Sequence, residues 1–217
     1  MFNKLFKVNL ETKNEMNRNV VDNYSRLKLS LFLLPLFFLM AIVLFLYYQD
    51  ALSVEKYIQI QKSSFLFINS KLSQFPILIY NLTQIGDALV FLSLLTILIV
   101  YAPKIWESLL TASLVSAIFS NVLKNMFAIP RPAASFDNTS FVIIGKTLSG
   151  HNSLPSGHSI TVFTILTVLL FAWMPKKLSY KIPWVFFVIV IGLFIVSTRV
   201  GVGAHYPLDV ITGSSRG

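Results

Sequence analysis

The sequence contains no cysteine among its 217 residues, and only 12% of the residues carry a charge. The absence of cysteine excludes disulfides and thiolate metal sites, and it leaves the redox compartment open. Soluble domains have about 25% charged residues, so the low charge content excludes an ordinary soluble protein. Acidic residues are the scarcer kind: 9 Asp and Glu stand against 18 Lys and Arg, which gives a net charge of +9.

The basic excess can report either nucleic-acid binding or membrane orientation. No basic stretch is interleaved with aromatic residues in the way that a base-stacking surface requires, so no nucleic-acid partner is expected. The rest of the composition is apolar, with 55% hydrophobic residues and a mean hydropathy of +0.70. The sequence therefore predicts an integral membrane protein whose Lys and Arg residues indicate its orientation.

Long uncharged runs predict an all-α fold, a polytopic transmembrane bundle with a six-helix plan. A membrane-spanning helix needs roughly 20 apolar residues. The first helices are expected at Leu29–Tyr48, Ile77–Ala102, Glu107–Ala128, Ser156–Met174 and Ile182–Thr198. The sixth should begin near Tyr206, but only Val210 to Gly217 follow Asp209. That length is too short for a span, so the sixth helix is predicted to be truncated in this chain.

The segments outside these runs suggest how the chain is divided. Residues 1–28 are polar and lack the apolar core and cleavage site of a signal peptide. We predict a cytoplasmic N-terminal tail at 1–28 and one membrane domain at 29–217, whose activity is inferred from the residues described next. Residues 49–76 mix charged with aromatic side chains, which favours an amphipathic segment in the membrane interface.

The basic residues favour an orientation with the N-terminus in the cytoplasm. The tail, the turn at Lys104 and the loop from Lys176 to Lys181 then lie on the cytoplasmic side. The opposite, outer side receives the ends of four helices, and these ends carry polar and charged residues. They are Lys124, Arg131, Ser156, Gly157, His158, Arg199, His205 and Asp209. Charges that are distant in sequence and converge at one membrane depth indicate a functional site.

The three cationic side chains in this set, together with the start of the helix at Ser156, predict a phosphate-binding site. A phosphate ester spreads charge over its oxygens, which fixed cations and N–H donors hold. Lys124, Arg131 and Arg199 are the expected cations, and arginine matches phosphate oxygens in pairs. Ser156, Gly157 and the first amide groups of the following helix complete the predicted site.

Two histidines and an aspartate account for the predicted chemistry. His205 is the candidate nucleophile, provided that the proton on its other ring nitrogen is anchored. Asp209 lies four residues further on and is the candidate anchor. His158 is the candidate general acid for the leaving alkoxide, and then the base for the water that releases phosphate from His205.

The order and spacing of these residues resemble the three-part signature of the type 2 phosphatidic acid phosphatase superfamily. The parts are Lys124-x6-Arg131-Pro132, Pro155-Ser156-Gly157-His158 and Thr198-Arg199-x5-His205-x3-Asp209. Position 198 departs from the pattern, which usually has serine there, but threonine keeps the hydroxyl. The resemblance implies a six-helix bundle, a phosphohistidine on His205, no metal or other cofactor, and a lipid phosphate or pyrophosphate substrate.

The predicted function is a metal-independent lipid phosphatase, which in a bacterium would act at the periplasmic face of the inner membrane. The lead-in to the second part, from Ser149 to Leu154, is similar to the bacterial lipid A 1-phosphatase branch. Lipid A 1-phosphate is therefore the expected substrate. Undecaprenyl pyrophosphate, phosphatidylglycerophosphate and phosphatidic acid remain open, as does the oligomeric state.

Other interpretations concern both the function and single residues. A phosphate- or lipid-binding membrane protein without turnover remains open, whereas a small-anion transporter is disfavoured because no charge or broken helix marks the bilayer midplane. Taken singly, the three cations are as readily membrane anchors. His151 is expected to contact the lipid headgroup. Asp87 either pairs with a site cation or faces the interface, and the interface is slightly favoured.

Overall fold

The computed structural model describes residues 2–215, and every regular element in this range is a helix. In chain order the elements are α1 (Phe2–Ser25), the 3-10 helix η1 (Leu29–Phe32), α2 (Leu33–Tyr48), α3 (Val54–Leu72), α4 (Pro76–Ile85), α5 (Ala88–Leu94), α6 (Ile97–Tyr101), α7 (Pro103–Phe127), α8 (Pro132–Ser135), α9 (Gly157–Ala172), α10 (Leu178–Gly201) and α11 (Pro207–Ser214). The all-α prediction is confirmed. The predicted truncation of the sixth helix falls at the end of the chain, where residues 216–217 lie outside the described residues.

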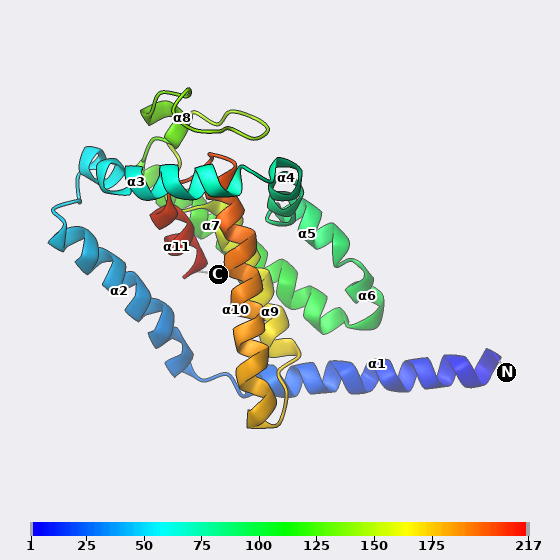
Figure 1. Ribbon diagram of the computed structural model, residues 1–217. Coiled ribbons are helices and arrows are strands. Elements are labelled where there is room, and N and C mark those ends of the chain that lie inside the picture. Colours follow the sequence, from blue (N-terminus) through cyan, green and yellow to red (C-terminus); the bar gives the residue numbers. More distant parts are fainter. Residues whose placement is uncertain (1, 216–217) are drawn as a thin grey trace.

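Within residues 2–215, three segments are long and apolar enough to cross a membrane, at Leu29–Tyr48, Pro103–Ser135 and Leu178–Gly201. Helices α4 and α5 qualify together as one bent span, and α9 is apolar but shorter, with 16 residues. Helix α9 lies at the centre and packs against α7, α10 and α11, whereas α2 stands apart from them (Figure 1). The predicted boundaries of these helices agree with the structure to within a few residues, except in the second helix.

The second helix is not continuous, so the prediction of one helix at Ile77–Ala102 is wrong. Helices α4 and α5 meet at an angle of 76°, and α6 follows after a second break. Oδ1 of Asp87 accepts hydrogen bonds from the N–H groups of Leu89 and Val90 at 2.9 and 3.2 Å. Aspartate is a strong N-cap, so it starts a new helix within a run that carries no other charge. The bend after Gly86 lies at the end of the bundle where the predicted site residues are found, which is called the site end below.

Helix α3 lies across the site end of the bundle (Figure 1). It has the amphipathic character predicted for residues 49–76, because one side of it is buried at every fourth position, by Tyr57, Gln61, Phe65 and Asn69. Its location in the membrane interface stays a prediction. Gln61 Oε1 accepts a hydrogen bond from the N–H of Leu208 at 2.8 Å, which ties α3 to the first turn of α11.

Aromatic packing fixes α3 and the loop after α8 over the start of α11. The ring of Phe65 lies 5.7 Å from Phe136, 5.1 Å from Phe141 and 5.9 Å from Tyr206, measured between centroids. Tilted and edge-to-face pairs of this kind contribute about 0.5–1.5 kcal/mol each beyond their burial. The cluster therefore holds rigidly the chain segment that carries His205.

Helix α1 crosses the opposite end of the bundle (Figure 1). Its Val20 is 1% exposed in an apolar cluster with residues of α7 and α9. The Asn23 side chain donates to the carbonyl of Ala172, and the Tyr24 hydroxyl donates to that of Val168. Helix α1 is thus docked on the bundle, and the division of the chain at residue 28 stays a prediction.

Candidate active site

The predicted site residues come together at one end of the bundle, although they lie on four different parts of the chain. They belong to α7 and the loop after it, the start of α9, the end of α10 and the start of α11. Most are buried, namely Arg131, Ser156, Arg199, His205 and Asp209. Burying a charged group is costly unless hydrogen-bond or charged partners compensate the lost hydration. The partners of these residues therefore define the geometry of the site.

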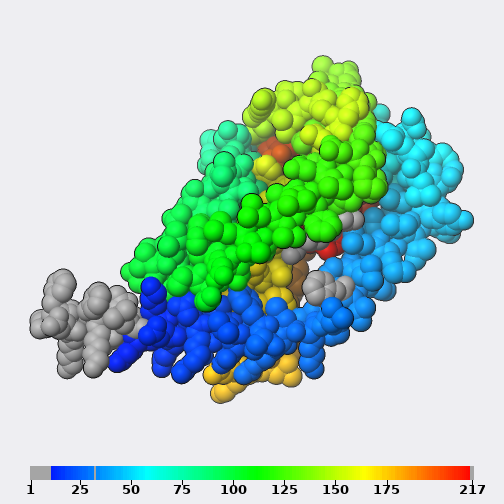
Figure 2. All heavy atoms as spheres, turned by 180° about the vertical axis from the view of Figure 1, so that it is seen from behind, coloured from blue at the N-terminus to red at the C-terminus, as the bar shows by residue number. Residues whose placement is uncertain are grey.

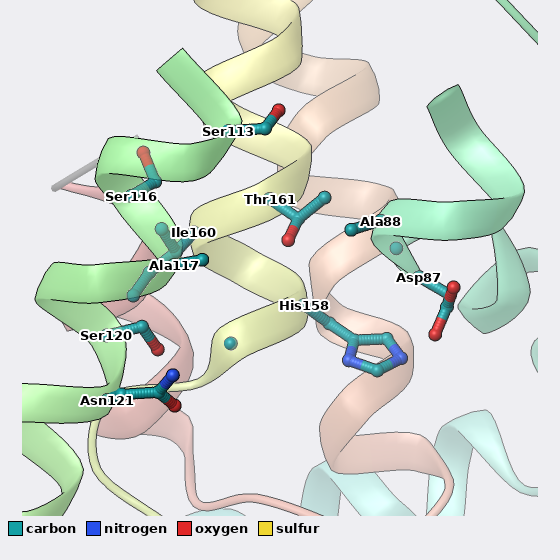
Figure 3. Close-up of a pocket in the computed structure, with 12 residues that line it drawn as sticks. Asp87, Ala88, Ser113, Ser116, Ala117, Ser120, Asn121, His158, Ile160 and Thr161 are labelled. Atoms are coloured by element: carbon teal, nitrogen blue, oxygen red, sulfur yellow. The ribbon is translucent and has the colours of Figure 1, made fainter. Parts of the chain in front are cut away.

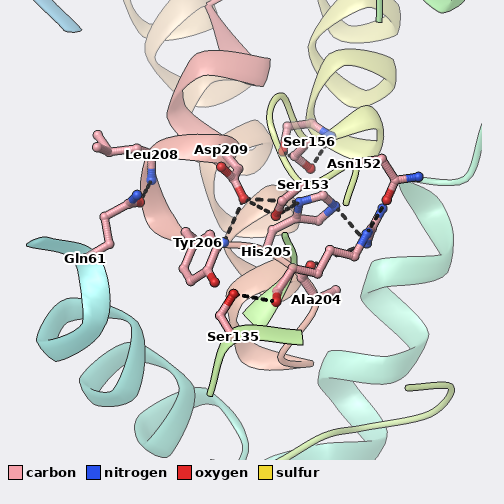
Figure 4. Close-up of polar contacts among 12 residues, drawn as sticks. Gln61, Ser135, Asn152, Ser153, Ser156, Ala204, His205, Tyr206, Leu208 and Asp209 are labelled. Carbon is pink, nitrogen blue, oxygen red and sulfur yellow. Dashed lines mark hydrogen bonds and ion pairs between the residues drawn. The ribbon is translucent and has the colours of Figure 1, made fainter. Parts of the chain in front are cut away.

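His205 lies between α10 and α11 with both ring nitrogens in defined contacts (Figure 4). Its Nδ1 lies 3.5 Å from Asp209 Oδ2 and 3.5 Å from Ser153 Oγ. Its Nε2 lies 3.4 Å from Nη1 of Arg131. Because arginine can only donate, Nε2 is the acceptor, and the proton belongs on Nδ1 toward Asp209. This tautomer leaves the Nε2 lone pair pointing at the cationic side of the site.

The surroundings of His205 also keep its ring neutral. Burial lowers the pKa of His205 well below its ordinary value of 6.5, and the charges of Arg131, Arg199 and Lys124 lower it further. Only the neutral imidazole has a lone pair with which to attack phosphorus. The ring is therefore ready to act as a nucleophile at neutral pH.

Asp209 is held by three hydrogen-bond donors. The Tyr57 hydroxyl donates to Oδ1 at 2.6 Å. The Ser153 hydroxyl donates to Oδ2 at 2.5 Å, and the Tyr206 N–H donates to Oδ2 at 3.0 Å (Figure 4). Burial and the charge of Asp209 raise the pKa of Tyr57 well above its ordinary value of 10, so this phenol remains a donor. Burial raises the pKa of Asp209 to about 6, and the three bonds oppose this rise by stabilising the ionised carboxylate that faces His205.

Tyr57 and Ser153 were not among the residues predicted from the sequence. Tyr57 lies 152 residues from Asp209 along the chain, and the amphipathic pattern of α3 shows only which side of the helix is buried. Ser153 is one of several serines in a loop without periodicity, so no sequence signal marks it. Both were found only through the folded structure.

Arg131 is fixed in the loop that follows α7. Its Nε donates to Oδ1 of Asn152 at 2.8 Å, and its Nη1 donates to the carbonyl of Ala204 at 3.3 Å. The backbone N–H of Arg131 donates to the carbonyl of Gly150 at 3.0 Å, which ties the two halves of the loop together. The guanidinium is therefore aimed at His205 by the loop itself.

Arg199, near the end of α10, is held by a residue that the sequence did not single out. Its Nη1 donates to Oγ1 of Thr83 on α4 at 2.9 Å. In the part of the chain that the structure describes, its Nε has no hydrogen-bond partner although the atom is buried. A buried donor without a partner is costly, and a bound phosphate oxygen would satisfy it.

Lys124 meets the first turn of α9 at Gly157. A Cβ placed on Gly157 would lie 3.0 Å from Nζ of Lys124, so glycine is what permits the ammonium to approach this turn. The N–H groups of Gly157 and His158 make no hydrogen bond to the described residues. A free first turn beside an ammonium is suited to bind an anion.

Ser156 serves first as the cap of α9. Its Oγ accepts from the N–H of Ser159 at 3.4 Å, and its own N–H donates to the carbonyl of Asp209 at 3.0 Å. The residue thereby joins the starts of α9 and α11. Direct contact of Ser156 with phosphate stays a prediction.

His158 lies on the first turn of α9, against the bend between α4 and α5 (Figure 3). A Cβ on Gly86 would lie 3.1 Å from Cβ and Cδ2 of His158, so the ring packs directly on that glycine. The Asp87 carboxylate lies beside the ring and lines the same cavity. In the described residues Asp87 forms no ion pair with Lys124, Arg131 or Arg199. Its position at the membrane interface stays a prediction.

Two further predictions are untested. His151 is exposed in the loop before Ser153, and its contact with a lipid headgroup stays a prediction. Among the described residues, no three His, Asp or Glu side chains are placed to share a metal ion. The expected independence of metals and other cofactors is a statement about the reaction, and it too stays a prediction.

The site geometry accords with what comparison with known proteins finds. The PAP2 superfamily matches residues 106–217, a range that contains every predicted site residue. The chain belongs to the PAP2 superfamily. The resemblance inferred from the three-part signature is thus confirmed.

Curated relatives within the superfamily have different names. The chain is 37% identical over 122 residues to a lipid A 1-phosphatase of Rhizobium etli, covering 54% of this chain and 47% of the relative. It is 30% identical over 135 residues to an undecaprenyl-diphosphatase of Sulfolobus acidocaldarius, covering 61% of this chain and 60% of the relative. The chain thus spans about half the length of the curated relatives it matches.

Two solved structures share the fold. The crystal structure of Aquifex aeolicus LpxE is 26% identical, with a TM-score of 0.58 over 71% of this chain and 88% of that one. A transmembrane PAP2-type phosphatidylglycerolphosphate phosphatase from Bacillus subtilis has a TM-score of 0.60 over 84% of this chain and 89% of that one. Because the second is only 18% identical, it shows the fold alone. Both confirm the helical membrane architecture.

Proposed function

We propose that this protein is a membrane lipid phosphatase that works through a phosphohistidine on His205, without a metal ion. One observation carries the proposal: the acceptor nitrogen of a neutral, buried His205 faces Arg131, while its other nitrogen faces Asp209. A binding protein needs the cations but not an oriented, neutral imidazole among them. An enzyme that attacks phosphorus needs both.

In the first step the phosphate of the lipid is held by Lys124, Arg131, Arg199 and the free amides of α9. Nε2 of His205 attacks phosphorus as the bond between phosphorus and the lipid oxygen breaks. His158 donates a proton to that oxygen, so the lipid leaves as an alcohol. The Asp209 carboxylate stabilises the positive charge that develops on the His205 ring.

In the second step water releases the phosphate. His158, now neutral, accepts a proton from the water, whose oxygen attacks phosphorus as the bond to Nε2 breaks. Inorganic phosphate leaves, and both histidines return to their starting protonation states. The Nε–H of Arg199, which lacks a partner in the described chain, is placed to stabilise the transferring group in both steps.

Lipid A 1-phosphate is the proposed substrate. The support is the lipid A 1-phosphatase name of the Rhizobium relative and the LpxE title of the Aquifex structure. Undecaprenyl pyrophosphate is the second candidate, since the Sulfolobus relative bears that activity's name. Phosphatidylglycerophosphate and phosphatidic acid are further candidates.

The proposed location is the bacterial inner membrane, with the site facing the periplasm. Lys104, at the start of α7, lies at the opposite end of that helix from Lys124. Lys176 and Lys177 lie between the end of α9 and the start of α10, and Lys181 lies in the first turn of α10. Basic residues next to spans favour the cytoplasmic side, which supports an outward-facing site end.

The test is to present the purified protein, in detergent, with a panel of lipid phosphates and to measure free phosphate with and without a chelator. We expect release from lipid A that carries a 1-phosphate, unchanged by the chelator. Loss of activity on metal removal would contradict the histidine mechanism. Binding without any release would support the alternative, a phosphate- or lipid-binding membrane protein.

A further inference from the structure

A cavity of about 240 Å³ opens beside His158, between α5, α7 and α9. Figure 3 shows its walls, with α7 and α5 on either side of α9. Figure 2 shows the same face hollowed between α5 and α7, with α9 visible inside the hollow. The cavity connects the catalytic histidine at the start of α9 with the lateral surface of the bundle.

The cavity lies on one side of the proposed reaction centre. In phosphoryl transfer the attacking and leaving atoms are roughly in line on opposite sides of phosphorus. His205, the attacking group, does not line the cavity, whereas His158, which protonates the leaving oxygen, does. The cavity is therefore where the leaving alcohol of the substrate would lie.

The walls of the cavity are unlike the rest of the lipid-facing surface. They are mostly small or polar, and Ile160 is the one large apolar side chain among the lining residues. The outward surface of α7 bears large apolar side chains, namely Leu114, Val115, Ile118 and Phe119, 49–67% exposed. An acyl chain in the cavity would leave polar groups without partners, so the lining suits a headgroup that forms hydrogen bonds.

Several polar groups of the cavity are free to bind such a headgroup. Within the described chain, the side chains of Ser120, Asn121 and Thr161 make no hydrogen bond, and Ser113 Oγ is buried without a partner. Asp87 uses Oδ1 to cap α5, and its Oδ2 accepts no hydrogen bond from the described residues. Donors and acceptors are thus both available beside His158.

We propose that this cavity is the leaving-group subsite, and that it takes the neutral, hydroxylated headgroup of a lipid phosphate monoester, such as a sugar or glycerol unit. Asp87 disfavours an anionic leaving group, such as the polyprenyl phosphate that a diphosphate releases, because like charges repel. The proposal rests on the proposed phosphatase function and names the part of the substrate that is recognised. The volume is below the roughly 300–1,000 Å³ of sites for drug-sized ligands, so one headgroup unit fits and the lipid chains stay outside.

The test compares three substrates: lipid A 1-phosphate, dodecyl phosphate without hydroxyl groups, and farnesyl diphosphate. Thr161→Val and Asn121→Leu each remove one polar group from the cavity. We expect each to lower kcat/KM about tenfold for lipid A, the effect of one lost hydrogen bond, and less than about twofold for dodecyl phosphate. Thr111→Val is the control, because Thr111 is exposed on α7 and donates to its own helix at Glu107. It should leave all three rates unchanged.

Asp87→Asn tests the charge and keeps an N-cap residue at the start of α5. We expect kcat/KM to fall for lipid A and to rise above the wild-type value, about tenfold, for farnesyl diphosphate. Equal losses on all three substrates in the cavity variants, or no gain with the diphosphate, would overturn the subsite. If the wild-type protein releases no phosphate from any of the three, the proposed function fails instead.

Discussion

The two histidines of the site lie in opposite kinds of surroundings. His205 is 1% exposed, and contacts to Arg131, Ser153 and Asp209 fix both of its nitrogens. The ring of His158 makes no hydrogen bond to the described residues and lies at the wall of an open cavity. The side of the proposed nucleophile is thus fully assembled, while the side of the proposed leaving group is open.

This difference matches the demands of the two roles. A nucleophile must be held in one tautomer and one position, because small misplacements cost orders of magnitude in rate. A proton donor to the lipid must share its space with a headgroup, so its surroundings include part of the substrate. We infer that the half of the site around His205, called the closed half, carries the chemistry. The half around His158, called the open half, selects the lipid.

The largest expected effect tests the closed half directly. His205→Ala removes the nucleophile, so phosphate release should fall by at least about 10^4-fold. The variant should still bind lipid phosphate through Lys124, Arg131 and Arg199. Release is measured as free phosphate, and the phosphoenzyme is measured by acid-labile labelling from a radioactive substrate. Retained turnover, or a label that persists in the variant, would rule out the phosphohistidine.

A smaller loss, which depends on the substrate, is expected on the open half. His158→Gln removes the proton donor and should lower the rate about 10^2–10^4-fold for an alkyl phosphate. The loss should be much smaller for p-nitrophenyl phosphate, whose leaving group needs no proton. The ratio of the two rates is the measurement. An equal loss with both substrates would show that His158 binds phosphate and does not donate a proton.

A third variant breaks the support of the closed half without touching the reacting groups. Tyr57→Phe keeps the ring and removes the donor to Asp209, so kcat should fall about 10–100-fold, the effect of one hydrogen bond to a charged group. The acid limb of the pH profile should move to higher pH, because the ionised carboxylate loses a donor. The matched control is Tyr24→Phe, which removes a hydroxyl bond at the opposite end of the bundle. If both variants behave alike, the role of Tyr57 is only structural.

The smallest expected effect is the absence of a titration. Since burial and cations lower the pKa of His205 well below 6.5, its ring should stay neutral as the pH falls from 8 to 6. The chain has 3 histidines, so carbon-13 labelling of the imidazoles and NMR in detergent can follow each one, with His205→Ala for assignment. A His205 signal that titrates with a midpoint near 6.5 would show that the closed half is hydrated.

The extent of successful prediction differs between these regions. The spacing of Lys124, Arg131, Arg199, His205 and Asp209 was sufficient to predict that these side chains come together at one end of the bundle, whereas their roles in phosphate binding and attack stay predictions. Tyr57, Ser153 and Thr83 were not predicted, because a hydrogen bond between distant segments leaves no local pattern. The break at Asp87 was missed for another reason: the run was long enough for one span, and its single charge was not taken as a helix cap.

The sequence by itself determined the class of fold and the chemical groups of the site. Apolar runs of bilayer length can only be buried as helices in a membrane, and the motif residues have few other uses in that setting. Only the tertiary structure decided how the two histidines differ, because burial and hydrogen-bond partners come from α3, α4 and the bend before α5. Those elements contain none of the motif residues, and packing alone brings them to the site.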